Sequence, residues 1–109
     1  MSMMEGYLLI TTTIDDGRKA EELASLLVER RLAACTQILG PIRSIYRWKG
    51  SIQKDEEYLL LIKSRKEHFQ DIEELFKTEH PYEVPELVGW KLEVGSEGYL
   101  GWMSESLLP

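Results

Sequence analysis

The chain has 109 residues, a length typical of one domain, so we expect residues 1–109 to form a single domain. Its net charge of −6 argues against general nucleic-acid binding, which requires a basic surface. There is no run of eighteen apolar residues to predict a membrane span, and the first residues do not resemble a signal peptide. A lone cysteine, Cys35, cannot form an internal disulfide, which fits a reducing compartment. We therefore expect a cytoplasmic protein that does not insert into membranes.

The first half of the chain predicts a strand, a helix and a second extended stretch. Residues 7–14 are β-branched and apolar, with apolar residues on both faces at the start, as in a strand at the centre of a sheet. Capping residues at 15–17 stop this strand and begin an amphipathic helix that ends near Arg31. An extended stretch over 32–48 follows, divided at residues 40–41 by a Gly-Pro pair.

The second half of the chain predicts four further elements. They are, in order, a strand over 58–63 behind a hairpin turn at Lys49-Gly50, a helix from Ser64 or Arg65 to Glu79, a strand over 87–94 and a short helix after Gly95-Ser96. The strand over 58–63 is apolar on both faces, whereas the strand over 87–94 alternates as a half-buried edge strand does.

This order predicts the α+β class with a ferredoxin-like split βαβ fold, βαββαβ plus a C-terminal helix, and an antiparallel sheet in the order 4-1-3-2. The first and third strands are central in that topology, and these are the two with apolar residues on both faces. Right-handed crossovers put both long helices on one face of the sheet. The other face is apolar and only partly covered, so we expect a homo-oligomer.

The segment over residues 80–87 is stiff and polar. Pro81 and Pro85 fix the backbone and push the preceding residues into extended geometry. The segment offers an imidazole, a phenol and carboxylates from His80, Tyr82, Glu83 and Glu86. It is either a rigid helix-to-strand connection or a preorganised polar site, since loops carry many functional residues.

Several motifs together resemble the CutA divalent-cation-tolerance family. They are Leu32-Ala-Ala-Cys35, Trp48-Lys-Gly-Ser-Ile52, Glu57, Ile62-Lys63, His80-Pro-Tyr-Glu-Val-Pro-Glu86 and Tyr99-Leu100 with Trp102. The resemblance covers nearly the whole chain. It implies a small cytoplasmic homotrimer, similar in build to the PII nitrogen-signalling proteins and associated with tolerance to copper and other divalent cations. The chain departs from the family pattern at Thr36-Gln37, where Val-Asn is usual.

Metal binding is the first functional hypothesis. A thiolate from Cys35 and an imidazole from His80 suit copper or zinc, and Glu83 could add an oxygen ligand. The spacing does not form a known single-chain metal motif. The structural alternatives are a buried cysteine at Cys35 and a helix-end histidine bonded to a backbone carbonyl at His80. His68, on the polar side of the second helix, should be solvated.

Binding of a small anionic or neutral ligand between subunits is the second hypothesis, by analogy with PII proteins. Lys63, Tyr82, Trp48 and Tyr46 are the candidates to line such a cleft, with His80 alongside. Alternatively, the aromatic residues pack in an interface and Lys63 pairs with Glu83.

Catalysis is the third hypothesis, with Cys35 as nucleophile, His80 as base and a carboxylate as orienter. A cysteine after Ala-Ala in a strand lacks the electropositive surroundings of a reactive thiol. We therefore expect that the protein is not an enzyme.

Overall fold

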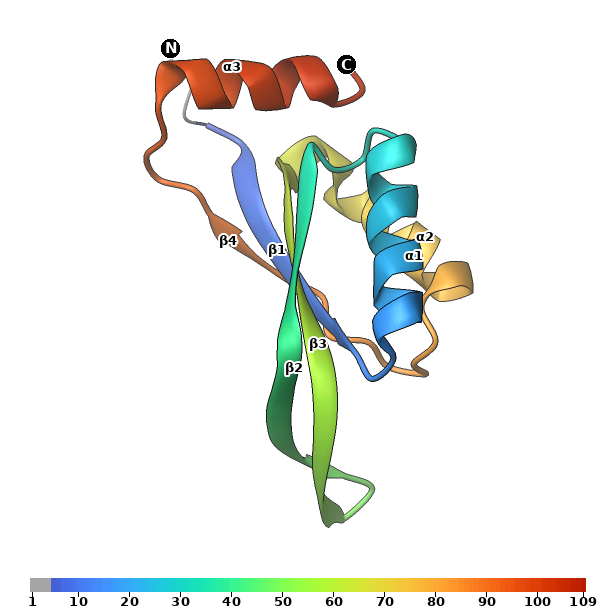
Figure 1. Cartoon of the computed structure of the whole chain (residues 1–109). Coiled ribbons are helices and arrows are strands. Elements are labelled where there is room, and N and C mark those ends of the chain that lie inside the picture. The colour runs from blue at the N-terminus through green and yellow to red at the C-terminus, as the bar shows by residue number, and fades with distance from the viewer. Residues whose placement is uncertain (1–4) are drawn as a thin grey trace.

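The computed structural model describes residues 5–109 and contains one mixed sheet-and-helix unit (Figure 1). Its elements are β1 (Tyr7–Ile14), α1 (Gly17–Glu29), β2 (Cys35–Trp48), β3 (Ser51–Arg65), the 3₁₀ turn η1 (Lys66–His68), α2 (Phe69–Glu79), β4 (Val88–Lys91) and α3 (Glu97–Ser106). All strand pairs are antiparallel, in the order β2-β3-β1-β4. This confirms the predicted α+β fold and the 4-1-3-2 order of the sheet.

The two faces of the sheet are covered differently. Helices α1 and α2 lie on one face, where the core consists of buried residues such as Ile10, Leu60, Leu27 and Ile72 (Figure 1). Helix α3 lies across one end of the sheet, where a smaller cluster forms around Tyr7, Ala34, Leu100, Met103 and Leu107. No helix within residues 5–109 is both long and apolar enough to cross a membrane.

Strands β2 and β3 extend well beyond the rest of the sheet. Strand β1 pairs with β3 only from Tyr58 to Arg65, whereas β2 pairs with β3 as far as Ser51. The remainder forms a two-stranded ribbon that projects from the molecule (Figure 1). Its side chains include the exposed apolar residues Ile45 and Ile52, 63% and 61% exposed.

Two predicted boundaries were wrong. The helix expected from Ser64 or Arg65 starts as the 3₁₀ turn η1, with Arg65 as N-cap, and becomes α-helical at Phe69. Ser64 itself stays in β3, where it pairs with Leu8 and donates a 2.6 Å hydrogen bond to the Leu32 carbonyl. Strand β4 is shorter than the predicted 87–94. On the side expected to be buried, Val88 and Trp90 are 47% and 55% exposed, and only Leu92, beyond the end of β4, packs against the cluster under α3.

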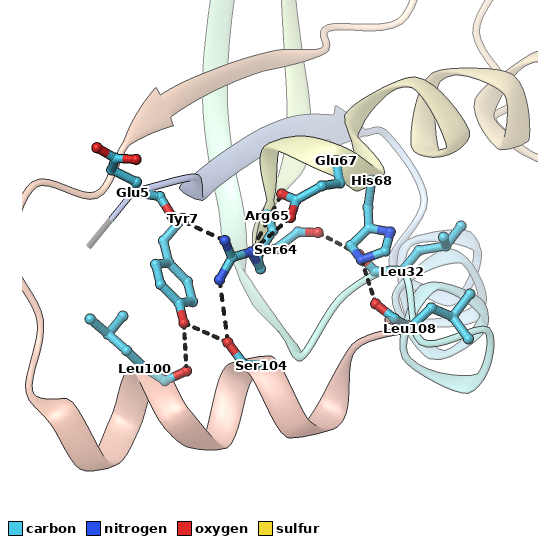
Figure 2. A network of polar contacts seen from close by, with 10 residues as sticks. All are labelled: Glu5, Tyr7, Leu32, Ser64, Arg65, Glu67, His68, Leu100, Ser104 and Leu108. Atoms are coloured by element: carbon cyan, nitrogen blue, oxygen red, sulfur yellow. Dashed lines mark hydrogen bonds and ion pairs between the residues drawn. The ribbon is translucent and has the colours of Figure 1, made fainter. Parts of the chain in front are cut away.

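A polar network fastens α3 and the C-terminal residues to the sheet (Figure 2). The Tyr7 hydroxyl donates to the Leu100 carbonyl at 3.1 Å, and the Arg65 guanidinium contacts Ser104 at 3.3 Å. His68 is 6% exposed, and its Nε2 donates to the Leu108 carbonyl at 3.0 Å. The prediction that His68 is solvated was therefore wrong, because the C-terminal end of the chain folds back over it.

Candidate functional site

Residues 80–87, which we call the strap, run from the end of α2 to the start of β4 and contact both faces of the sheet. On the helix side, His80 Nε2 lies 2.9 Å from Thr12 Oγ1. On the other side, Thr11 Oγ1 donates to Glu86 Oε2 at 2.7 Å. Because neighbouring residues of a strand face opposite sides, these two contacts place the strap around the end of β1.

The hydrogen bonds of His80 define its tautomer. The backbone N–H of Tyr82 donates to His80 Nδ1 at 3.1 Å, so this nitrogen must carry a lone pair. In the neutral ring the proton is then on Nε2, which donates to Thr12. The ring is 7% exposed and is in contact with the aromatic rings of Phe76 and Tyr82. Both ring nitrogens of His80 therefore hold the strap in place.

The surroundings of His80 favour its neutral form. Burial lowers the pKa of His80 below its ordinary value, while a backbone hydrogen bond with Thr13 and the negative charges of Glu57 and Asp15 oppose this shift. Burial is the largest of these influences because removal from water penalises the imidazolium.

Tyr82 connects the strap to the projecting β2–β3 ribbon. Its hydroxyl donates a 2.6 Å hydrogen bond to Glu57 Oε2. Glu57 is only 5% exposed, an uncommon environment for a carboxylate. Burial, and then the hydrogen bond and negative charge of Glu57, raise the pKa of Tyr82 well above its ordinary value. The phenol therefore remains a donor at neutral pH and stabilises the buried carboxylate.

An acidic hollow of about 740 Å³ opens between the strap and the ribbon. Its lining shares two chemical types, carboxylates and aromatic rings, and consists of Thr13, Asp15, Ser44, Ile45, Tyr46, Trp48, Asp55, Glu57, Tyr82, Glu83, Val84, Pro85 and Glu86. The lining contains five carboxylates and no lysine or arginine. The Tyr46 hydroxyl donates to Asp55, and this bond is the main reason that the pKa of Tyr46 rises to about 12. The hollow is suited to cations and unsuited to anions.

Part of the predicted site is brought together in this hollow. Tyr46, Trp48, Tyr82 and Glu83 all line it. Lys63 does not, because its Nζ contacts the Tyr99 hydroxyl at 3.2 Å and lies over the Tyr99 ring. The expectation of a cleft suited to an anionic ligand therefore loses its only cationic residue.

The three candidate metal residues lie apart. Cys35 is half-buried and pairs in register with Lys63 of β3. His80 reaches Thr12, which pairs with Leu60, so it lies three residues further along β3 and on the opposite face of the sheet. Within residues 5–109, no group of three or more His, Cys, Asp or Glu residues converges as a metal site does.

No part in a binding site was predicted for the acidic residues opposite the strap, Asp15, Asp55 and Glu57. Their signal in the sequence is weak, because Asp55 and Glu57 stand in a polar run of a ribbon that gives no periodic indication of burial. Alternation along the strand could have indicated the position of Glu57, since it shares a face of β3 with Leu59 and Leu61.

These features define a small ferredoxin-like protein with an acidic hollow beside a strap that His80 holds in place by hydrogen bonds. The model of the CutA1 divalent ion tolerance protein family matches residues 8–106. The Thermus thermophilus divalent-cation tolerance protein CutA is 42% identical over 103 residues, covering 94% of this chain and 98% of its own length. The chain therefore belongs to the CutA family.

Solved structures agree with this assignment. CutA1 from Oryza sativa superposes with a TM-score of 0.93 at 32% identity and covers 98% of both chains. A structure from Archaeoglobus fulgidus, named a periplasmic divalent cation tolerance protein CutA, gives a TM-score of 0.88 at 32% identity and covers 92% of this chain and 97% of its own. The chain spans little more than half the length of several animal and plant relatives.

Proposed function

We propose that this protein is a homotrimeric, cytoplasmic divalent-cation tolerance protein that binds copper or another divalent metal ion in metal homeostasis. The acidic hollow carries this proposal, because it gathers five carboxylates without a lysine or arginine among its lining residues. Such a concave acidic surface raises the local concentration of cations. Membership of the CutA family supports the same activity.

The carboxylates of the hollow are the proposed ligands. Oxygen ligands from Asp and Glu suit divalent ions, with Glu57 fixed by Tyr82 and Glu83 free on the strap. The lining carboxylates of one chain do not converge on a point, so we propose that a neighbouring subunit completes the coordination. His80 has no free lone pair in its observed hydrogen bonding, and it acts here through the strap instead.

Exposed apolar surface supports the proposed homotrimer. Ile45 and Ile52 of the ribbon and Trp90 of the edge strand β4 are more than half exposed in the single chain. Exposed apolar side chains on open strand edges are usually covered by another chain. The number three comes from the resemblance to the CutA family, and sedimentation at micromolar concentration tests it. A stable, well-folded monomer would contradict the assembly.

We propose no catalysis. Cys35 and His80 are on opposite faces of the sheet, so the nucleophile and base that an enzyme would need are not within reach of each other. The name of the family describes tolerance to divalent ions and names no reaction.

A PII-like sensor that binds a small ligand without catalysis is the second candidate. The observation in its favour is the trio of aromatic rings in the hollow, Tyr46, Trp48 and Tyr82. Aromatic walls with a few polar groups are typical of small-molecule sites. The surrounding carboxylates favour a cationic ligand for such a site.

Calorimetric titration of the metal-free protein with Cu(II), Cu(I) and Zn(II) tests the proposed function. We expect Glu57→Gln and Glu83→Gln to weaken binding, because each removes one negative charge from the hollow. Glu73→Gln is the matched control, since Glu73 is exposed on α2 and outside the hollow. Dissociation constants above about 0.1 mM for every ion, or normal binding by both hollow variants, would contradict the proposed site.

A further inference from the structure

We propose that His80 couples proton uptake to cation release, holding the strap against the acidic hollow only while its imidazole is neutral. This inference rests on the proposed binding of cations in the hollow. It assigns His80 as a positioning residue that controls the site from the opposite face of the sheet.

The hydrogen bond at His80 Nδ1 explains why the strap is held by the neutral imidazole and not by the protonated one. Nδ1 accepts the backbone N–H of Tyr82, and Nε2 already donates to Thr12. A protonated imidazole has two N–H donors, so its Nδ1–H would face the Tyr82 N–H, donor against donor. The imidazolium therefore cannot keep this bond. Either the ring or the backbone at Tyr82 must move, because two donors that face each other leave a buried donor unsatisfied.

Movement at Tyr82 reaches the hollow directly. Tyr82 and the four strap residues that follow it are lining residues, and the Tyr82 hydroxyl holds Glu57 at 2.6 Å. Displacement of the strap breaks this bond and moves Glu83. Pro81 and Pro85, two residues to either side of Glu83, restrict the backbone, so the segment has little freedom to absorb the change locally. Proton uptake at His80 thus removes one wall of the cation site.

Charged groups surround His80 on several sides. Glu57 of β3 and Asp15 after β1 attract a proton to the ring, and Thr12 and Thr13 of β1 are neutral partners. A second hollow, separate from the acidic one, has His80 and Pro81 in its lining. Its charged lining residues are of both signs: Arg18, Lys19, Glu21, Glu22 and Glu29 of α1, and Glu79 of α2. Burial outweighs the attraction, so the pKa of His80 is below its ordinary value. Protonation of His80 therefore requires a more acidic solution than protonation of an exposed histidine.

A bound divalent cation opposes the same protonation. The positive charge of the cation in the hollow disfavours the imidazolium form of His80. The cation also contacts the strap, which the neutral form of His80 holds in position. Linkage requires that the effect is reciprocal, so a proton at His80 weakens cation binding by the factor that the cation weakens proton binding.

The test is calorimetric titration with Zn(II) at pH 7.5, 6.5 and 5.5, comparing wild type with His80→Asn and His68→Asn. Asparagine does not titrate, and its side-chain oxygen can accept the N–H of residue 82 as an Asx turn does. We expect wild-type affinity to fall as the pH drops from 7.5 to 5.5, by less than about tenfold, because the pKa of His80 lies below its ordinary value and one proton per site is exchanged. In His80→Asn, the ratio of the affinity at pH 7.5 to that at pH 5.5 should be close to one. His68→Asn should retain the wild-type ratio, because His68 is the chain's only other histidine and binds Leu108.

A second measurement uses the wild type alone. In the metal-free protein, NMR should show the Tyr82 backbone amide changing with the same midpoint as the His80 ring. Failure to observe this joint change, or a pH dependence that persists in His80→Asn, would overturn the coupling. Wild-type binding that does not depend on pH would overturn the coupling alone, whereas no Zn(II) binding at pH 7.5 would overturn the proposed site as well.

Discussion

Replacement of Tyr82 by phenylalanine tests how the strap is attached to the ribbon. The variant removes one hydroxyl, which donates at 2.6 Å to the buried Glu57 carboxylate. Hydrogen bonds to charged groups contribute about 1.5–3 kcal/mol, and the half-buried position of Tyr82 places the expected loss near 2 kcal/mol. For a domain of this size such a loss lowers the melting temperature by roughly 10 °C.

The assay is urea denaturation at pH 7 and one fixed protein concentration, because an oligomer's stability depends on concentration. The matched set is wild type, Tyr82→Phe, Glu57→Gln and the double variant. Tyr82→Phe should lower the free energy of unfolding less in the Glu57→Gln background than in the wild type, with a coupling energy of about 1 kcal/mol. A loss below about 0.5 kcal/mol in Tyr82→Phe, or strict additivity, would refute this account of the strap.

Three further predictions concern helix packing, backbone geometry and pH. Leu100→Ala should cost about 2–5 kcal/mol in the same assay, since Leu100 is 1% exposed, whereas Leu108→Ala, at 43% exposure, should cost far less. Gly40→Ala should be destabilising because Gly40 has φ +156° and a Cβ would lie 2.7 Å from Tyr58 Cδ2, while Gly101→Ala, with open space in α3, should stabilise by about 0.5–1 kcal/mol. Burial lowers the pKa of His80 in the folded state, so the unfolded chain binds more protons between that pKa and its own pKa near 6.5. Stability should therefore decrease as the pH is lowered through this window, by up to about 1.4 kcal/mol per pH unit. His80→Asn should flatten that slope, and an equal slope in both proteins would contradict the assignment.

The sheet could be predicted because its signals are local. Residues 7–14 match β1 at both ends, and the apolar faces of the strand over 58–63 correctly identified the centre of the sheet. Alternation and capping act over a few residues and need no knowledge of distant partners. The order of the strands then follows from the order of the elements.

The failures concern contacts between distant parts of the chain. Ser64 was expected at a helix start, yet its hydroxyl binds the carbonyl of Leu32 and keeps it in β3. His68 was expected in solvent because its neighbours in sequence are polar, but the C-terminal residues cover it. A single sequence does not indicate which carbonyl will reach which side chain across such separations.

The acidic hollow shows the same division between local and distant information. The stiffness of the strap follows from its two prolines, and its polar residues were recognised as a candidate site. The sign of the site's charge was not predictable from the strap alone, because Asp55 and Glu57 come from the ribbon and Asp15 from the end of β1. The same long-range packing changes the interpretation of His80. A histidine that resembles a ligand in the sequence becomes, with both nitrogens bonded to Thr12 and Tyr82, the group that holds the ligand-binding wall in place.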